Sequence, residues 1–200
     1  MNIGNPKSLY SGERQVGKFL YEIAEDHLFR YKYASLYVKF SDLVLDAACG
    51  CGYGSFILSF FSKEVIGVDV SEETIDFAKQ YYERENILYK PLDLEKPINF
   101  INGKFDVIVS LETIEHLKDP LPFLLYAKEI LKPDGYFLCS IPDAESGIVT
   151  PFHSRNYSFD SAYDLLIRYF YIKKIETQLR ERNGDNHRFF LFVCVNRKAK

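Results

Sequence analysis

The stretch "LVLDAACGCGYGS" (residues 43–55) decides the fold. It begins as a short apolar run with strand character and then carries a glycine at every second position, at Gly50, Gly52 and Gly54. Such glycines let the backbone pass close to a ligand at the start of a helix, and Asp69, nineteen residues after Gly50, is well placed to accept hydrogen bonds from ribose hydroxyls. Ser55 stands where a GxGxxG motif would carry its last glycine. The pattern therefore predicts a nucleoside site suited to a cofactor without a pyrophosphate.

Short apolar strand patterns alternate with helical patterns along the chain, which is typical of βαβ units and a parallel sheet. We expect strands at 43–48, 64–69, 86–91, 105–111 and 135–141, and helices at about 53–62, 72–84 and 120–132, the second opened by Ser71 as N-cap. A helix near 160–168, strands near 169–177 and 187–196 and the turn "RNGDN" (182–186) predict an antiparallel hairpin. Residues 13–38 look helical.

The expected fold is therefore α/β, a Rossmann-like doubly wound sheet of seven strands, mostly parallel, with an antiparallel C-terminal hairpin. A chain of 200 residues with 47% hydrophobic content has room for one core. We expect a single domain over residues 1–200, with an N-terminal helical cap (1–40) and a Rossmann-like core (41–200).

Composition excludes some classes of function and partner. The net charge of −3 gives no general attraction to nucleic acid. The longest apolar runs are far shorter than the roughly 20 residues that span a bilayer, so no membrane span is expected. The four cysteines form no CxxC pair and the N-terminus lacks the apolar region of a secretory signal, which predicts reduced thiols and a cytoplasmic location.

The stretch "LETIEHL" (111–117) places two carboxylates and an imidazole just after an apolar strand pattern. If it turns helically, Leu111, Ile114 and Leu117 share one side, while Glu115 and His116 both neighbour Glu112. The apolar side is then expected to pack in the core, and the side with the titratable groups to bind a ligand. The alternative is that both carboxylates are solvated first-turn residues and His116 is hydrogen-bonded locally.

Five segments in order resemble the motifs of class I S-adenosylmethionine-dependent methyltransferases, over about residues 9–196. They are "VLDAACGCGYGS", "VIGVDVS", "PLDLEKP", "FDVIVSLETIEHL" and "LKPDGYFLCSIP". One departure is Ala48, where many members carry glycine. The resemblance implies S-adenosylmethionine as cofactor and assigns nine residues to its site. Asp46, Ala48, Gly50 and Gly52 would line the methionine moiety, Asp69 and Val70 the ribose, and Asp93 and Leu94 the adenine, while Leu111 would form the floor of the site.

Two further segments resemble bacterial methyltransferases that modify sugars of surface polysaccharides. "PFHSRNYS" (151–158) is similar to their "NPFHxREYS", departing at Asn156, and "SGERQV" (11–16) with "EDHLFRYKYA" (25–34) echoes their N-terminal pattern. This resemblance implies O-methylation of a sugar or nucleotide-linked sugar in glycan biosynthesis. His153 and the 112–116 group would both lie at the carboxyl edge of the sheet, where open α/β folds bind ligands.

The ExxEH turn with a later histidine also resembles metal-dependent methyltransferases of RNA 3′-terminal ribose and ubiquinone-pathway O-methyltransferases. This implies a site for Mg²⁺ or Mn²⁺ made by Glu112, Glu115, His116 and His153. Without a metal, His116 or His153 is the candidate general base, and Glu112 is the third candidate catalytic residue.

Two alternatives to a sugar acceptor stay open at this point. One is a methyltransferase of RNA 3′ ends, which should show a basic groove, and the other acts on a different small molecule. The acceptor and the oligomeric state cannot be read from the sequence.

A solvated position is expected for Arg30 in the N-terminal helix.

Overall fold

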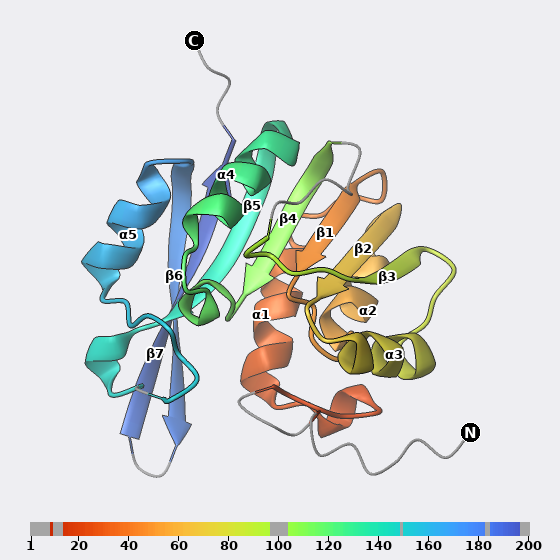
Figure 1. The fold of residues 1–200 in the computed structure, drawn as a ribbon, viewed down its shortest axis with the longest axis horizontal. Helices are drawn as coiled ribbons and strands as arrows, with labels where there is room; N and C mark the ends of the chain where they lie inside the picture. The colour runs from red at the N-terminus through yellow and green to blue at the C-terminus, as the bar shows by residue number, and fades with distance from the viewer. Residues whose placement is uncertain (1–8, 10–13, 97–103, 149, 183–184, 197–200) are drawn as a thin grey trace.

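One seven-stranded sheet organises the chain in the order β3-β2-β1-β4-β5-β7-β6 (Figure 1). The computed structural model describes residues 9, 14–96, 104–148, 150–182 and 185–196. Neighbouring strands from β3 to β5 are parallel, and β7 runs antiparallel to both β5 and β6. The expected α/β sheet with an antiparallel C-terminal hairpin is therefore confirmed. The strands are β1 (Leu43–Ala47), β2 (Glu64–Asp69), β3 (Ile87–Pro91), β4 (Phe105–Leu111), β5 (Leu131–Pro142), β6 (Tyr171–Arg182) and β7 (Asp185–Val195).

Helices cover both faces of this sheet (Figure 1). Buried side chains of α1, α2 and α3 pack with one set of strand residues, and those of α4 and α5 with the alternate set. Ser71 caps α3 as expected, because its hydroxyl accepts the backbone N–H of Thr74. Within the described residues, no helix combines the length and apolar character that crossing a bilayer requires. The α-helices are α1 (Glu25–Ser35), α2 (Tyr53–Ser59), α3 (Glu72–Tyr81), α4 (Leu121–Ile130) and α5 (Phe159–Ile167), and 3-10 turns form at η1 (Leu20–Glu22), η2 (Ile114–His116) and η3 (Ala144–Ser146).

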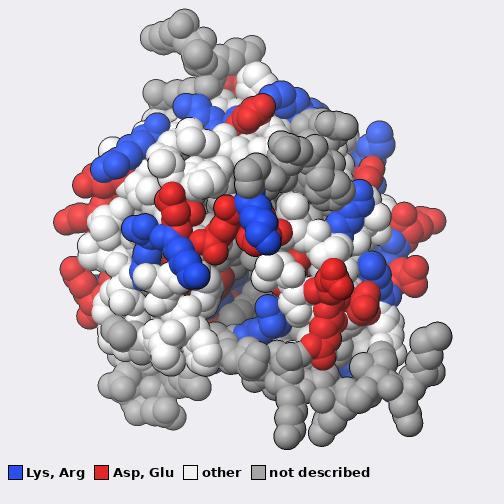
Figure 2. All heavy atoms as spheres, viewed as in Figure 1, with Lys and Arg blue, Asp and Glu red and all other residues white. Residues whose placement is uncertain are grey.

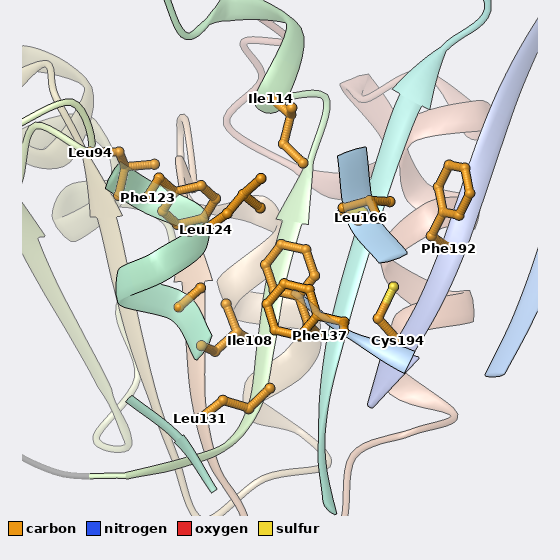
Figure 3. Packing of buried hydrophobic residues seen from close by; sticks show 14 of the residues in the cluster. Leu94, Ile108, Ile114, Phe123, Leu124, Leu131, Phe137, Leu166, Phe192 and Cys194 are labelled. Atoms are coloured by element: carbon orange, nitrogen blue, oxygen red, sulfur yellow. The ribbon is translucent and has the colours of Figure 1, made fainter. Parts of the chain in front are cut away.

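The core forms on both faces because strand residues alternate between them. On the α4/α5 face, Phe137 of β5 stacks on Phe170 at 4.6 Å between ring centroids and lies beside Phe123 of α4 (Figure 3). On the other face, Val107 packs in the cluster that holds Tyr31 of α1. This sandwich fixes the carboxyl ends of the parallel strands, and the loops that follow them, at one edge.

The N-terminal helix is shorter than the sequence suggests. Of the expected helix 13–38, residue 13 lies outside the described part, residues 14–19 are not helical, and α1 begins only at Glu25. The carboxylate of Glu22 accepts the backbone N–H groups of Lys18 and Phe19, which gives this segment a turn in place of helical bonding.

The passage from α4 to β5 also differs from the expectation. The helix ends at Ile130, and β5 starts at Leu131, four residues before the expected strand. Pro133 disfavours the helical conformation at Lys132, which explains the early end of the helix. Asp134 then adopts a φ of +64° while the β4–β5 register shifts, so "KPDG" forms an irregular strand start.

The C-terminal hairpin extends past the edge of the sheet. The last residue of β5, Pro142, pairs with Phe189, while β6 and β7 stay paired out to Arg182 and Asp185. Residues 183–184 of the expected turn lie outside the described part. The hairpin therefore runs beyond the last residue of β5 and reaches α1, where Arg30 Nε donates to Gln178 Oε1 at 2.8 Å. Figure 1 shows the end of the hairpin and α1 at the same end of the sheet.

Candidate active site

A cavity of about 990 Å³ opens at the carboxyl edge of the sheet. The loops after β1, β2, β3 and β4 line one part of it. Residues 14 and 15, α1, the β6–β7 hairpin and residues 147, 148, 150, 152 and 153 line other parts. This volume is at the upper end of the range for pockets that bind small molecules and cofactors. Seven of the nine residues expected at the cofactor line it: Ala48, Gly50, Asp69, Val70, Asp93, Leu94 and Leu111.

The three glycines of the 50–54 loop have different reasons to be glycine. Gly50 has a φ of +55°, and among the described residues a Cβ added there would meet the Arg14 Cγ alone, at 3.9 Å. At Gly52 an added Cβ would lie 2.6 Å from the Cβ of Ala78, and at Gly54 2.0 Å from the ring of Tyr31. Gly50 therefore has an open backbone that a ligand can approach, whereas Gly52, which does not line the cavity, and Gly54 are glycines because neighbours pack on them.

Asp46, the other expected cofactor residue outside the cavity lining, is fully buried below the loop. Its carboxyl group accepts hydrogen bonds from the hydroxyls of Ser55 at 2.6 Å and Tyr31 at 3.1 Å. Burial, together with the charge of Asp69, raises the pKa of Asp46 to about 7, although these two hydrogen bonds act in the opposite direction. In the structure Asp46 ties α1 and α2 to the end of β1.

Asp69 ends β2 at the cavity wall, as the sequence predicts. Its Oδ2 accepts the backbone N–H of Gly50 at 3.1 Å, and its Oδ1 accepts that of Ser71 at 3.0 Å. Arg14 lies 3.5 Å from Oδ1. The two backbone donors hold the carboxylate in one orientation beside the open backbone of Gly50, which is the arrangement that recognition of ribose hydroxyls needs.

The "LETIEHL" stretch forms the 3-10 turn η2 after β4. Leu111, Ile114 and Leu117 are buried, so the expected packing side is present. Glu112 has a φ of +49°, an uncommon conformation for a residue with a side chain. Ser140 of β5 holds it there, because its hydroxyl accepts the Glu112 N–H at 2.9 Å and donates to Glu112 Oε1 at 2.6 Å.

Three of the four expected metal ligands come together. One ligand atom each of Glu115, His116 and His153 lies within 4.8 Å of the others, and the two imidazole centroids are 5.1 Å apart. Two ligands about 2.1 Å from one ion are at most about 4.2 Å apart, so small adjustments would let this donor set hold a divalent ion. Glu112 lies outside this group of three, with its carboxylate on Ser140.

Burial and one hydrogen bond describe how Glu115 and His116 are held in this group. Glu115 is 1% exposed, so the alternative reading of it as a solvated helix-start residue is wrong. His116 Nδ1 lies 3.1 Å from the carbonyl oxygen of Phe152. A carbonyl can only accept, so Nδ1 carries the proton in this bond and the lone pair of Nε2 remains for a metal or an acceptor proton.

A basic group that the sequence patterns do not predict lies on the other side of the cavity. Arg30, expected in solvent, is 1% exposed and lines the cavity together with Arg180 of β6. Both guanidinium groups contact the Asp26 carboxylate, at 3.1 and 3.0 Å. The i,i+4 spacing of Asp26 and Arg30 was a local signal for their pairing, but nothing in the sequence near Arg180 indicates that it reaches α1.

The strand order, the cofactor-type loop after β1 and the acidic end of β2 define a protein with the class I S-adenosylmethionine-dependent methyltransferase fold. Comparisons with known proteins agree: residues 45–139 match the family model described as a methyltransferase domain. The chain is 33% identical over 129 residues to a Mycolicibacterium smegmatis protein named "Probable S-adenosylmethionine-dependent methyltransferase", covering 62% of this chain and 49% of that one.

Two other similar proteins bear on the class. A ubiquinone biosynthesis O-methyltransferase of Cereibacter sphaeroides is 34% identical over 99 residues, covering 48% of this chain and 40% of its own. The solved structure of the N-methyltransferase NodS from Bradyrhizobium japonicum has a TM-score of 0.73 over 87% of this chain and 96% of its own, at 17% identity, which shows the fold alone. The chain spans about half the length or less of these curated relatives. Together the findings show a methyltransferase fold in a chain that is similar to S-adenosylmethionine-dependent methyltransferases.

Proposed function

We propose that this protein transfers the methyl group of S-adenosylmethionine to a hydroxyl oxygen of a sugar or nucleotide-linked sugar. The observation that carries the proposal is one continuous cavity lined by the cofactor-type residues Gly50 and Asp69 and, further along, by Glu112, His116 and His153. A methyl donor and an acceptor bound in the same cavity can meet without crossing solvent.

The cofactor is proposed to lie with its ribose on Asp69, its adenine near Asp93 and Leu94, and its sulfonium end toward Leu111. Each of these four residues lines the cavity. The sulfonium makes the methyl carbon electrophilic, so the protein has to align the acceptor oxygen in line with it and remove one proton. His116 Nε2 has the free lone pair for that proton, and His153, whose ring lies beside it, is the second candidate base.

The sugar assignment rests on the segment 151–158 and its resemblance to sugar-modifying methyltransferases. Thr150, Phe152 and His153 line the cavity beside the proposed reaction centre, which is where an acceptor has to bind. Acidic and basic side chains are interspersed on the face of the molecule that Figure 2 shows, and a terminal RNA substrate would favour a basic groove. A cytoplasmic location fits such a substrate and stays a prediction.

Calorimetry with S-adenosylhomocysteine, the demethylated product, tests the cofactor site. Asp69→Ala should weaken binding by about 1–3 kcal/mol, the scale for hydrogen bonds to a charged group. Asp76→Ala is the matched control, because Asp76 is an exposed residue of α3 whose carboxylate lies on Lys79. Tight NADH binding without a response to either sulfur nucleoside would end the proposal.

Transfer of a radiolabelled methyl group tests the acceptor. Nucleotide sugars, free sugars and short RNAs are offered to the protein in parallel, and label is expected only in a sugar-containing product. Strong labelling of an RNA 3′ end would move the alternative function into first place.

A second candidate, metal-dependent O-methylation of RNA 3′ ends or of another small molecule, draws on the Glu115, His116 and His153 group. These three residues would hold a divalent ion, which would supply positive charge beside the reacting oxygen. Exhaustive chelation should then abolish transfer and leave S-adenosylhomocysteine binding intact, since the proposed cofactor residues are separate from the group. Activity that survives chelation would leave a histidine base as the simpler mechanism.

A further inference from the structure

The end of the cavity between α1 and the β6–β7 hairpin carries a basic cluster, Arg30, Arg180 and His187, which the proposed methyl transfer does not use. Arg180 of β6 stands opposite His187 of β7, and Gln178 stands opposite Phe189. Alternate residues of a strand share a face, so these four side chains all lie on the hairpin face that meets α1. Arg30, Arg180, His187 and Phe189 line the cavity.

This cluster has more positive charge than its carboxylate can neutralise. The guanidinium groups of Arg30 and Arg180 pair with the same oxygen, Oδ2 of Asp26, at 3.1 and 3.0 Å. His27 lies beside them, but burial and the charge of Arg30 lower the pKa of His27 to about 3, which keeps it neutral. Two cations on one carboxylate leave about one positive charge in a largely buried place, and such a charge is costly unless a further anion binds.

The guanidinium of Arg30 is held in one geometry and keeps an unused donor. Its Nε donates to Gln178 Oε1 at 2.8 Å, and its Cζ atom lies over the ring of Phe189, 4.3 Å from the ring centroid. Within the described part of the chain, Nη1 of Arg30 and Nδ1 of His187 are buried and have no hydrogen-bond partner. Buried polar atoms are normally satisfied, so these atoms point to a ligand that is absent from the bare protein.

We propose that this cluster, Arg30, Arg180 and His187, binds an oxyanion of the methyl acceptor, as the diphosphate of a nucleotide-linked sugar would provide. The inference rests on the proposed function and narrows its acceptor from any sugar to a charged one. Sheet order supports the placement. Asp69 ends β2 on one side of β4, whereas Arg180 and His187 lie on β6 and β7 on the other side, so the acceptor anion binds across the reaction centre from the cofactor ribose. Guanidinium groups are the preferred partners of phosphate and carboxylate oxygens.

Calorimetry with the full chain saturated with S-adenosylhomocysteine, in buffer containing a chelator, tests this site. The probes are UDP-glucose, inorganic pyrophosphate, glucuronate and glucose. We expect UDP-glucose and pyrophosphate to bind and neutral glucose to bind at least about tenfold more weakly. Arg180→Gln should weaken UDP-glucose binding about tenfold or more, with Arg180→Lys intermediate. Arg168→Gln, which removes an exposed guanidinium outside the cavity, is the matched control and should change nothing.

The outcomes separate this inference from the proposed function. Glucuronate binding with no pyrophosphate binding would identify the oxyanion as a sugar carboxylate, with the same residues recognising it. If no anionic probe binds, or if Arg180→Gln leaves their binding unchanged, the oxyanion site is wrong, while intact S-adenosylhomocysteine binding keeps the methyltransferase proposal. If Arg180→Gln instead weakens the binding of S-adenosylhomocysteine as much as that of UDP-glucose, the cluster binds the cofactor's own carboxylate, and the inference fails. Thermal unfolding of each variant excludes loss of folding as the cause.

Discussion

The contact between Gly54 and Tyr31 should decide whether α1 stays attached to the cofactor loop. A Cβ placed on Gly54 would lie 2.0, 2.1 and 2.4 Å from three ring atoms of Tyr31, where ordinary contacts begin near 3.4 Å. Gly54→Ala therefore has to push the ring away by more than about 1 Å. Tyr31 has little room to move, because it is 5% exposed and its hydroxyl donates a hydrogen bond to Asp46.

The magnitudes predict a clear loss of stability. Overpacking a core costs about 1–3 kcal/mol, and losing the Tyr31–Asp46 hydrogen bond about 1–3 kcal/mol more. The gain from alanine in a helix is at most about 1 kcal/mol, so Gly54→Ala should lose about 3 kcal/mol of unfolding free energy. S-adenosylhomocysteine should also bind more weakly, since Tyr31 lines the cavity.

Urea unfolding of four proteins measures this as a double-mutant cycle: wild type, Gly54→Ala, Tyr31→Leu and the double variant. Leucine lacks the three ring atoms that clash, so in the Tyr31→Leu background Gly54→Ala should cost nothing or gain up to about 1 kcal/mol. The reasoning is refuted if Gly54→Ala alone is as stable as wild type, or if its cost is the same in both backgrounds.

Two further predictions concern the strand ends beside the cavity. The pKa of Asp46 is raised to about 7 in the folded protein, so the native state keeps a proton that the unfolded chain releases above about pH 4. Wild-type stability should therefore fall relative to Asp46→Asn as pH rises from about 4 to 7, in urea titrations across that range, and parallel curves would contradict this. Ser140→Ala should lower the unfolding free energy by about 1–3 kcal/mol, because it removes both hydrogen bonds that hold Glu112 in its left-handed conformation. The variant should also transfer the methyl group more slowly, while calorimetry shows unchanged S-adenosylhomocysteine binding. Full activity of that variant would show that Glu112 does not depend on Ser140.

Local patterns predicted the sheet and much of the cavity for a definite physical reason. Parallel strands end at a common edge, so residues that follow strand ends meet there even when they are far apart in sequence. His116 follows β4 and His153 follows β5, and their rings do lie together. The same rule brings Gly50 and Asp69 side by side, joined by a hydrogen bond at 3.1 Å.

The patterns failed where a side chain depends on packing between elements. Asp46 has the position of a cofactor residue in the motif, yet contacts from Tyr31 and Ser55 keep it below the cavity. Helical spacing placed Glu112 beside Glu115, and the family resemblance implied that both would bind one metal ion. The left-handed backbone at Glu112 instead turns its carboxylate to Ser140. A periodicity argument assumes regular dihedral angles, and the site lies at the residue that departs from them.

The basic cluster also depends on contacts between elements, and these elements are far apart in the sequence. Arg30 and Gln178 are 148 positions apart and meet only because the hairpin runs beyond Pro142, the last residue of β5. The second strand of that hairpin carries the continuous apolar run "FFLFVCV" (189–195), typical of a buried strand, and neither strand reveals that its far end will face α1. The length by which the hairpin exceeds β5 therefore sets which residues line the proposed acceptor end of the cavity. Relatives that keep the glycine loop and Asp69 but change the hairpin would then keep the cofactor and change the acceptor, which makes the hairpin the part of this fold where acceptor specificity should reside.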